Sequence, residues 1–176
     1  MNKYQIYMAG PDVFFNNFED YIKDVKKFVV ENGFDDLLQI NFPIEYEIDL
    51  SQCKTQYEKG IAIRKGNENA IINSHAVIAN LNPFRSNEPD VGTAYEIGFA
   101  RALKKNVIVF TNNSNKSMIE IYGSDFDEVS QSKVENFDAP FNLMLSPTNK
   151  EEIQSNYQDA IRLMYAMVKE RISIFN

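Results

Sequence analysis

The runs AVIANL at residues 76–81 and NVIVFT at residues 106–111 decide the fold of this chain. Both are short, apolar and rich in β-branched side chains, which is typical of strands buried on both faces of a parallel sheet. The segment DVGTAYE at residues 90–96 lies between them and reads as a glycine turn followed by the start of a helix. A strand, a helix and a second strand in this order predict a unit of an α/β fold.

The same alternation continues toward the N-terminus. Residues 5–9 form a short apolar run that stops at Gly-Pro, and we predict a buried first strand there. Apolar positions recur at helical spacing over residues 18–32, behind Asn17 as a candidate cap. A second strand over residues 37–42 and a second helix over residues 58–73 complete the predicted N-terminal half.

The last third of the chain is expected to begin with a polar loop from about residue 112 to 140, followed by a short apolar segment at 141–145. A final helix follows, and Thr148 and Glu151 have the spacing of a capping box for it. Residues 1–176 are therefore expected to form a single α/β domain, an open and mostly parallel sheet with helices on both faces.

The composition argues against several kinds of partner and site. The 176 residues carry a formal net charge of −7, so no clustered positive field is available for polymeric nucleic acid or for an anionic membrane surface. The N-terminus lacks the long apolar stretch of a secretory signal, and we expect a cytoplasmic protein. A lone Cys53 and a lone His75 do not make a zinc site, and no metal or organic cofactor is expected.

Ligands of open parallel sheets bind beside the carboxyl ends of the strands. The loop GPDVFF and the segment 82–92 follow the first and third predicted strands, so they meet at one rim. Gly92 allows a sharp turn and Thr93 can cap a helix, which places Glu96 near the positive end of that helix.

We expect the Glu96 carboxylate to stay ionised there and to attack an electron-poor sugar carbon. The structural alternative is that Asp90 is a helix cap and Glu96 an exposed residue of the first turn.

Five segments, in register, resemble the nucleoside 2-deoxyribosyltransferase family over nearly the whole chain. They are IYMAGPDVF at 6–14, AVIANLNPFRSNEPDVGTAYEIGFA at 76–100, VIVFT at 107–111, IYGS at 121–124 and PFNLML at 140–145. The resemblance implies a flavodoxin-like α/β sheet and a pentosyl-transfer enzyme of nucleoside salvage. Such an enzyme moves the 2-deoxyribosyl group of a small-molecule deoxynucleoside to another free nucleobase, through a covalent sugar ester on a glutamate.

The resemblance assigns catalytic roles to three residues. Glu96 attacks the anomeric carbon, Tyr7 orients the Glu96 carboxylate through its hydroxyl, and Asp90 holds a sugar hydroxyl. The residues alone leave open that Tyr7 is a buried strand tyrosine with a satisfied hydroxyl.

Four more residues are assigned to substrate binding. Phe14 resembles the aromatic that packs on the nucleobase, and Gly10 lies in the same loop. Asn142 resembles an asparagine that a neighbouring subunit inserts into the sugar pocket, which implies a homo-oligomer, a dimer or higher. Arg85 faces the substrate or bridges loop carboxylates. A core position for Phe14 and a position at a strand edge for Asn142 are the structural alternatives.

One position departs from the family pattern. The family carries an aspartate just before the third strand that binds and protonates the base, where this chain has His75. A histidine there could donate a proton to the leaving base and change the base preference, or be only a loop residue.

Two other functions fit the same residues. One is an N-glycoside hydrolase of deoxynucleosides or their 5′-monophosphates, in which water resolves the sugar ester, and the other is a non-catalytic nucleotide-binding module. Asp12 and Asp90 disfavour a phosphate, so unphosphorylated deoxynucleosides are the expected substrates. The loop GPDVFF also lacks the phosphate cradle of a flavoprotein and the glycine pattern of a dinucleotide site.

Overall fold

A central sheet of five parallel strands organises this computed structural model, which describes residues 3–174. The strand order is β2-β1-β3-β4-β7, the flavodoxin-like order in which the chain reverses direction across the sheet between β1 and β3. The strands are β1 (Tyr4–Ala9), β2 (Leu38–Asn41), β3 (Ala76–Asn80), β4 (Asn106–Phe110) and β7 (Ile153–Gln154). The predicted α/β class, parallel sheet and flavodoxin-like fold are confirmed.

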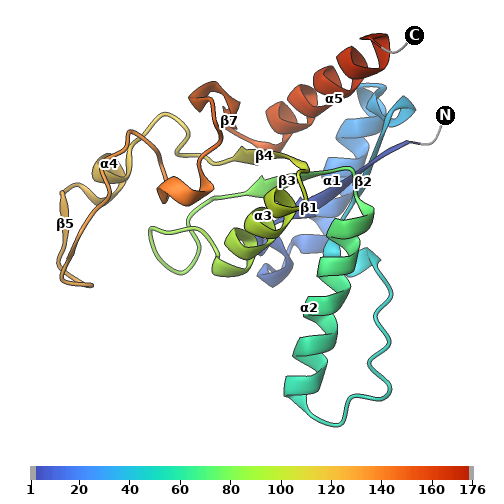
Figure 1. Cartoon of the computed structure of the whole chain (residues 1–176), viewed down its shortest axis with the longest axis horizontal. Helices are drawn as coiled ribbons and strands as arrows, with labels where there is room; N and C mark the ends of the chain where they lie inside the picture. Colours follow the sequence, from blue (N-terminus) through green and yellow to red (C-terminus); the bar gives the residue numbers. More distant parts are fainter. Residues whose placement is uncertain (1–2, 175–176) are drawn as a thin grey trace.

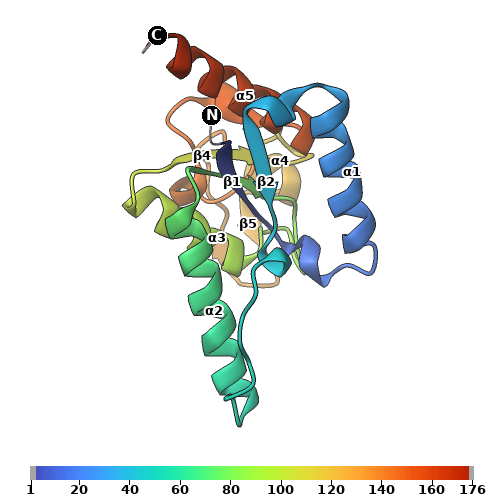
Figure 2. The same ribbon diagram turned by 90° about the vertical axis from the view of Figure 1, so that its right-hand side faces the viewer.

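Helices cover both faces of this sheet (Figures 1 and 2). α1 (Phe18–Glu31) and α5 (Tyr157–Ile174) pack on one face, and α2 (Gln56–Asn73) and α3 (Val91–Ala102) pack on the other. β1 contributes alternate residues to the two layers, with Ile6 on the α1/α5 side and Tyr7 on the α2/α3 side. The predicted 1–176 domain includes residues 1–2 and 175–176, which lie outside the described residues.

The remaining elements are short. The 3₁₀ turns are Pro11–Phe14, Phe34–Asp36, Pro43–Glu45, Leu143–Leu145 and Lys150–Glu152. The segment between β4 and β7 reaches sideways from the sheet (Figure 1) and contains the helix α4 (Met118–Tyr122) and the two-stranded hairpin β5 (Phe126–Asp127) and β6 (Ser132–Lys133). The prediction of one polar loop over residues 112–140 was therefore wrong, because Ser117 and Glu120 form a capping box that starts α4.

The final helix also begins later than predicted. Residues 150–152 form a 3₁₀ turn, and Ile153 then pairs with Val109 as part of the fifth strand. α5 starts only at Tyr157, where Asn156 Oδ1 accepts a hydrogen bond from the Asp159 N–H. The capping box predicted at Thr148 and Glu151 was wrong, because the edge of β4 offers pairing partners that outweigh a local helix signal.

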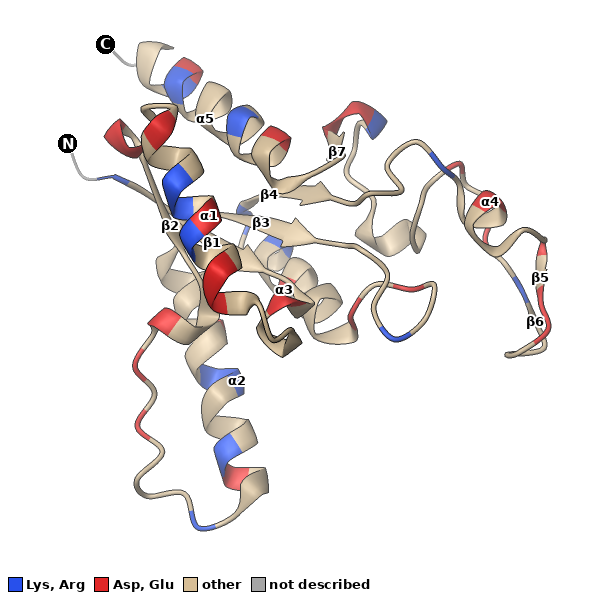
Figure 3. Cartoon of the chain, turned by 180° about the vertical axis from the view of Figure 1, so that it is seen from behind, with Lys and Arg blue, Asp and Glu red and all other residues tan. Residues whose placement is uncertain are grey.

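Charged residues of both signs are interspersed over the helices (Figure 3). Across residues 3–174, no helix is long and apolar enough to cross a membrane.

Candidate active site

A cavity of about 530 Å³ opens at the carboxyl ends of β1, β2 and β3. It lies at the reversal of strand order, where open α/β sheets bind their ligands. Its walls come from the loops after β1 and β2, from α2 and from the start of α3. The lining residues are Gly10, Val13, Phe14, Pro43, Ile44, Tyr46, Ile48, Leu50, Ile63, Asn67, Asp90, Gly92, Thr93 and Glu96. Four of the predicted site residues, Gly10, Phe14, Asp90 and Glu96, thus share one cavity.

Tyr7 lies beneath this cavity and contacts Glu96. The Tyr7 hydroxyl donates a hydrogen bond of 2.6 Å to Glu96 Oε1, and the Tyr7 side chain is fully buried in β1. Burial first, and then the nearby Glu96 carboxylate, raises the pKa of the Tyr7 hydroxyl, so it stays protonated and remains a donor. The short bond holds one carboxylate oxygen of Glu96 in a fixed position.

The electrostatics of Glu96 differ from the sequence expectation. Burial raises the pKa of the Glu96 carboxyl to about 7, the Tyr7 hydrogen bond lowers it, and the neighbouring Asp90 raises it. Position in the helix does not keep this group ionised, because Glu96 is the sixth residue of α3 and lies beyond the first turn, where the helix dipole acts. The expectation of a fully ionised carboxylate is corrected in this respect: removal of solvent raises the pKa of Glu96 to about 7, so both protonation states are populated near neutral pH.

Asp90 has two functions in this geometry. It is the N-cap of α3, and its Oδ2 accepts hydrogen bonds from the Thr93 N–H at 2.9 Å and the Thr93 hydroxyl at 3.1 Å. Thr93 was predicted as the cap, and the structure gives that position to Asp90. Asp90 still lines the cavity, and within residues 3–174 its Oδ1 makes no hydrogen bond, which leaves that oxygen for a ligand.

Gly10 permits a close approach in the loop after β1. A Cβ at this position would lie 2.4 Å from Asp12 Oδ2 and 2.9 Å from Asn80 Cβ. The Asp12 carboxylate accepts two hydrogen bonds of 3.0 Å from Asn80 Nδ2, so it is directed toward β3. Asp12 does not line the cavity, and the two carboxylates that do are Asp90 and Glu96.

Arg85 stacks on aromatic rings. Its guanidinium lies 5.2 Å from the centre of the Phe14 ring and 4.6 Å from that of Phe84, and the two rings stack at 5.5 Å. Arg85 makes no ion pair with another of residues 3–174, which removes the expected bridge to loop carboxylates, and it does not line the cavity. Its cation–π contact with Phe14 instead connects the loop after β3 with the loop after β1.

Asn142 lies outside the cavity of its own chain. It caps the turn Leu143–Leu145 and donates a hydrogen bond of 2.5 Å to Glu135 Oε1. It belongs to the segment between β4 and β7, at a point where the nearby Phe141 and Leu145 are buried in the core of the α2/α3 layer. A contribution to catalysis from Asn142 therefore requires a second subunit.

His75 is remote from the chemistry. It precedes β3 at the amino edge of the sheet, stacks on Tyr4 at 4.6 Å, and its Nδ1 accepts a hydrogen bond from the Gln5 N–H. The cavity lies at the opposite edge. The idea that His75 could protonate a leaving base was wrong, because a residue before a parallel strand and a residue after it lie at opposite edges.

Sequence reasoning missed Asn67, which lines the cavity from α2. Asn67 lies in α2, outside the segments that the sequence singled out, so no local pattern predicts that it lines the cavity.

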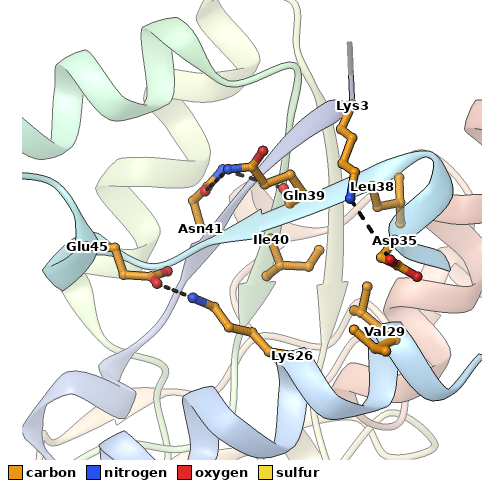
Figure 4. Close-up of a pocket in the computed structure, with 10 residues that line it drawn as sticks. Lys3, Lys26, Val29, Asp35, Leu38, Gln39, Ile40, Asn41 and Glu45 are labelled. Atoms are coloured by element: carbon orange, nitrogen blue, oxygen red, sulfur yellow. Dashed lines mark hydrogen bonds and ion pairs between the residues drawn. The ribbon is translucent and has the colours of Figure 1, made fainter. Parts of the chain in front are cut away.

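A second hollow of about 460 Å³ lies beside edge strand β2, where Lys26 pairs with Glu45 (Figure 4). Within residues 3–174 no group of three or more His, Cys, Asp and Glu side chains is arranged to hold a metal ion.

Comparison with known proteins places this geometry in context. A family model described as nucleoside 2-deoxyribosyltransferase matches residues 6–144. A 2-desoxiribosyltransferase from Leishmania mexicana superposes with a TM-score of 0.76 at 34% identity, covering 94% of this chain and 98% of that one. A conserved protein from Enterococcus faecalis V583 shares the fold, with a TM-score of 0.54 at 19% identity over 97% of this chain and 99% of that one.

A CMP N-glycosidase from Clostridium botulinum aligns with a TM-score of only 0.41 at 16% identity, over 90% of this chain and 98% of that one, a likeness too low to support a conclusion about function. No curated protein sequence gives a significant match.

Proposed function

This chain belongs to the nucleoside 2-deoxyribosyltransferase family of pentosyl-transfer enzymes, and we propose that it moves a 2-deoxyribosyl group between nucleobases through a covalent ester on Glu96. The observation that carries the proposal is the hydrogen bond from Tyr7 to Glu96 at the floor of the cavity. A fixed, buried carboxylate is suited to attack a sugar carbon whose transition state is positively charged.

The first step forms one bond and breaks another. The free Oε2 of Glu96 attacks the anomeric carbon from the face opposite the base, and the C–N bond breaks with its electron pair leaving on the base, which takes up a proton. A second base then attacks the sugar ester, Glu96 leaves as a carboxylate, and the incoming nitrogen loses its proton. Two inversions give net retention of configuration.

Tyr7 and Asp90 support this step in different ways. The Tyr7 hydroxyl fixes Oε1, so the other oxygen points at the substrate, and the hydrogen bond favours the ionised form of Glu96. Asp90 Oδ1 accepts a hydrogen bond from a sugar hydroxyl while Oδ2 remains bound to Thr93. Asp90 is anchored as the cap of α3, and Glu96 lies within the first two turns of the same helix. A sugar bound to Asp90 is therefore held at a fixed position relative to Glu96.

The lining of the cavity favours unphosphorylated nucleosides. No Lys or Arg is among its lining residues, whereas Asp90 and Glu96 are. A 5′-phosphate would bring two negative charges toward two carboxylates without a compensating donor, which disfavours nucleoside monophosphates. Phe14, Ile44 and Ile48 supply apolar surface for a base.

We further propose that the active enzyme is an oligomer in which Asn142 of one subunit enters the cavity of another. Asn142 does not line the cavity of its own chain, which supports an arrangement in which it acts in the cavity of another. Mixing of Glu96→Ala and Asn142→Ala proteins, followed by subunit exchange, tests it. Recovery of activity in the mixture, from two inactive parents, is expected, and an active Asn142→Ala protein or a lack of recovery would contradict shared sites.

The central experiment separates the three candidate functions. The protein is incubated with deoxyinosine or thymidine, with and without adenine, and bases and nucleosides are separated by chromatography. Deoxyadenosine that forms only with adenine supports transfer. Free base without a new nucleoside indicates a hydrolase, and no change in any mixture indicates a binding module or an enzyme that acts on deoxynucleoside 5′-monophosphates. Mass spectrometry of protein quenched with a donor alone should show a deoxyribosyl adduct on the peptide that contains Glu96, absent from Glu96→Gln.

A further inference from the structure

Ile48 seals one wall of the cavity by packing against Gly66 of α2. Ile48 lines the cavity, and a Cβ on Gly66 would lie 2.5 Å from Ile48 Cδ1 and 2.7 Å from Ile48 Cγ1. Cβ atoms do not approach side chains this closely, so Ile48 could not keep its place beside any other residue at position 66. The contact joins the loop segment 46–55 to the helix beside which it runs (Figure 2).

Gly66 lies on the face of α2 that forms the cavity wall. Ile63 and Asn67 line the cavity from the same helix, and positions three or four residues apart share one helix face. A glycine in the middle of a helix weakens it relative to alanine, so helix formation gives no reason for glycine at this position. Gly60 provides a contrast on the same helix, because a Cβ there meets no atom within 4 Å.

The strand order puts this contact between Gly66 and Ile48, which we call the Gly66–Ile48 notch, at the apolar end of the cavity. Asp90 and Glu96 come from the start of α3, which follows β3. Ile44, Ile48 and Leu50 come from the segment after β2, and β1 separates β2 from β3 in the sheet. Since the carboxylates serve the sugar, the nucleobase extends toward the apolar side chains.

We propose that the Gly66–Ile48 notch sets the size of the nucleobase that the enzyme accepts, an inference that rests on the proposed function. With glycine at position 66, Ile48 is held back against the backbone of α2, and the cavity keeps the width that a two-ring purine needs. A methyl group at position 66 displaces Ile48 away from α2 and toward the base. A one-ring pyrimidine needs less of that space and loses less by the displacement.

The test compares Gly66→Ala with its matched control Gly60→Ala. The measured quantity is the ratio of kcat/KM for deoxyadenosine to kcat/KM for thymidine as donors. Gly66→Ala should lower this ratio by roughly 10-fold, since one methyl group in an apolar pocket discriminates by about 10- to 200-fold. Gly60→Ala should leave it unchanged. Adding Ile48→Ala to Gly66→Ala removes the clashing branch and should return the ratio toward that of the wild type.

Each other outcome has a defined meaning. An unchanged ratio in Gly66→Ala, an equal fall in Gly60→Ala, or a wild type that uses pyrimidines alone would overturn the inference while leaving sugar transfer intact. A wild type that transfers sugar to no base would reject the proposed function and this inference together. If Gly66→Ala does not fold, Ile48→Ala alone decides: the wider cavity should raise kcat/KM for an N6-substituted purine deoxynucleoside relative to thymidine, and no rise would refute the notch.

Discussion

Replacing Tyr7 by Phe should move the acid limb of the pH–rate profile to higher pH. The Tyr7 hydroxyl donates to Glu96 at 2.6 Å, and this bond lowers the pKa of a carboxyl that burial raises to about 7. Removing the hydroxyl deletes the lowering influence and leaves burial and Asp90, which both raise it. The pKa of Glu96 therefore rises in Tyr7→Phe, and the nucleophile is ionised only at higher pH.

The size of the shift follows from the strength of the bond. A hydrogen bond to a charged group contributes about 1.5–3 kcal/mol, and about 1.36 kcal/mol corresponds to one pH unit, so the limb should move by about 1–2 pH units. Glu96 in the wild type is about half ionised at pH 7. With a pKa raised to about 8–9, only about 10% to 1% would be ionised, and the rate at pH 7 should fall by about 5- to 50-fold.

The assay is initial-rate transfer from thymidine to adenine between pH 5 and pH 10, for wild type and Tyr7→Phe. Most of the lost activity should return near pH 9–10, because the nucleophile is present and only its ionisation has changed. A uniform loss at every pH, with the acid limb in place, would refute this reasoning and would show that Tyr7 acts by orientation alone. Circular dichroism of both proteins controls for folding, since Tyr7 is a core residue.

Three further changes test the rest of the site. Glu96→Gln should be inactive yet more stable than the wild type at pH 8 by roughly 1–2 kcal/mol, a value reduced from the full cost of the pKa displacement because the group is partly solvated. The folded state holds the Glu96 proton more tightly than the unfolded chain, so wild-type stability falls as pH rises from 4.5 through about 7, and thermal melts at pH 5 should show almost none of this gain. Asp90→Asn keeps a capping acceptor for Thr93 and should lose activity by about 100-fold with little change in Tm, whereas Asp90→Ala should also lose about 1 kcal/mol of stability. Arg85→Gly should keep or raise Tm, because Arg85 has a left-handed φ of 61° that suits glycine, while steady-state kinetics should show a KM raised about 2- to 5-fold at constant kcat as Phe14 loses its cation–π contact.

The sequence predicted those parts of the fold whose signal is local. The strands at residues 76–80 and 106–110 are apolar β-branched runs with no competing reading, and α2 begins at a capping box of Thr55 and Glu58, two residues before the predicted start. The two residues of β7 were missed because Ile153 becomes a strand only through pairing with Val109, a partner far away in sequence. Strand pairing at such separation leaves no periodic pattern to read.

The candidate site shows the same division. Asp90 and Glu96 could be singled out because they flank one turn, and the family resemblance added Tyr7. The raised pKa of Glu96 could not be foreseen, because it depends on how much solvent the folded chain removes. The Gly66–Ile48 notch and the cation–π contact of Arg85 with Phe14 join segments that are distant in sequence, so only the fold shows them.

Side chains of β1 alternate between the two helix layers, so the enzyme could be stabilised from one layer without changes to the layer that carries the cavity. Ile6 and Met8 point into the layer of α1 and α5, while Tyr7 and Ala9 point into the layer that carries the cavity. Successive residues of this strand therefore belong to different layers, one on the far side of the sheet and one on the side of the cavity. A biocatalyst could be stabilised, or attached to a support, through the α1/α5 side with its reaction centre untouched on the other side of a sheet one residue thick.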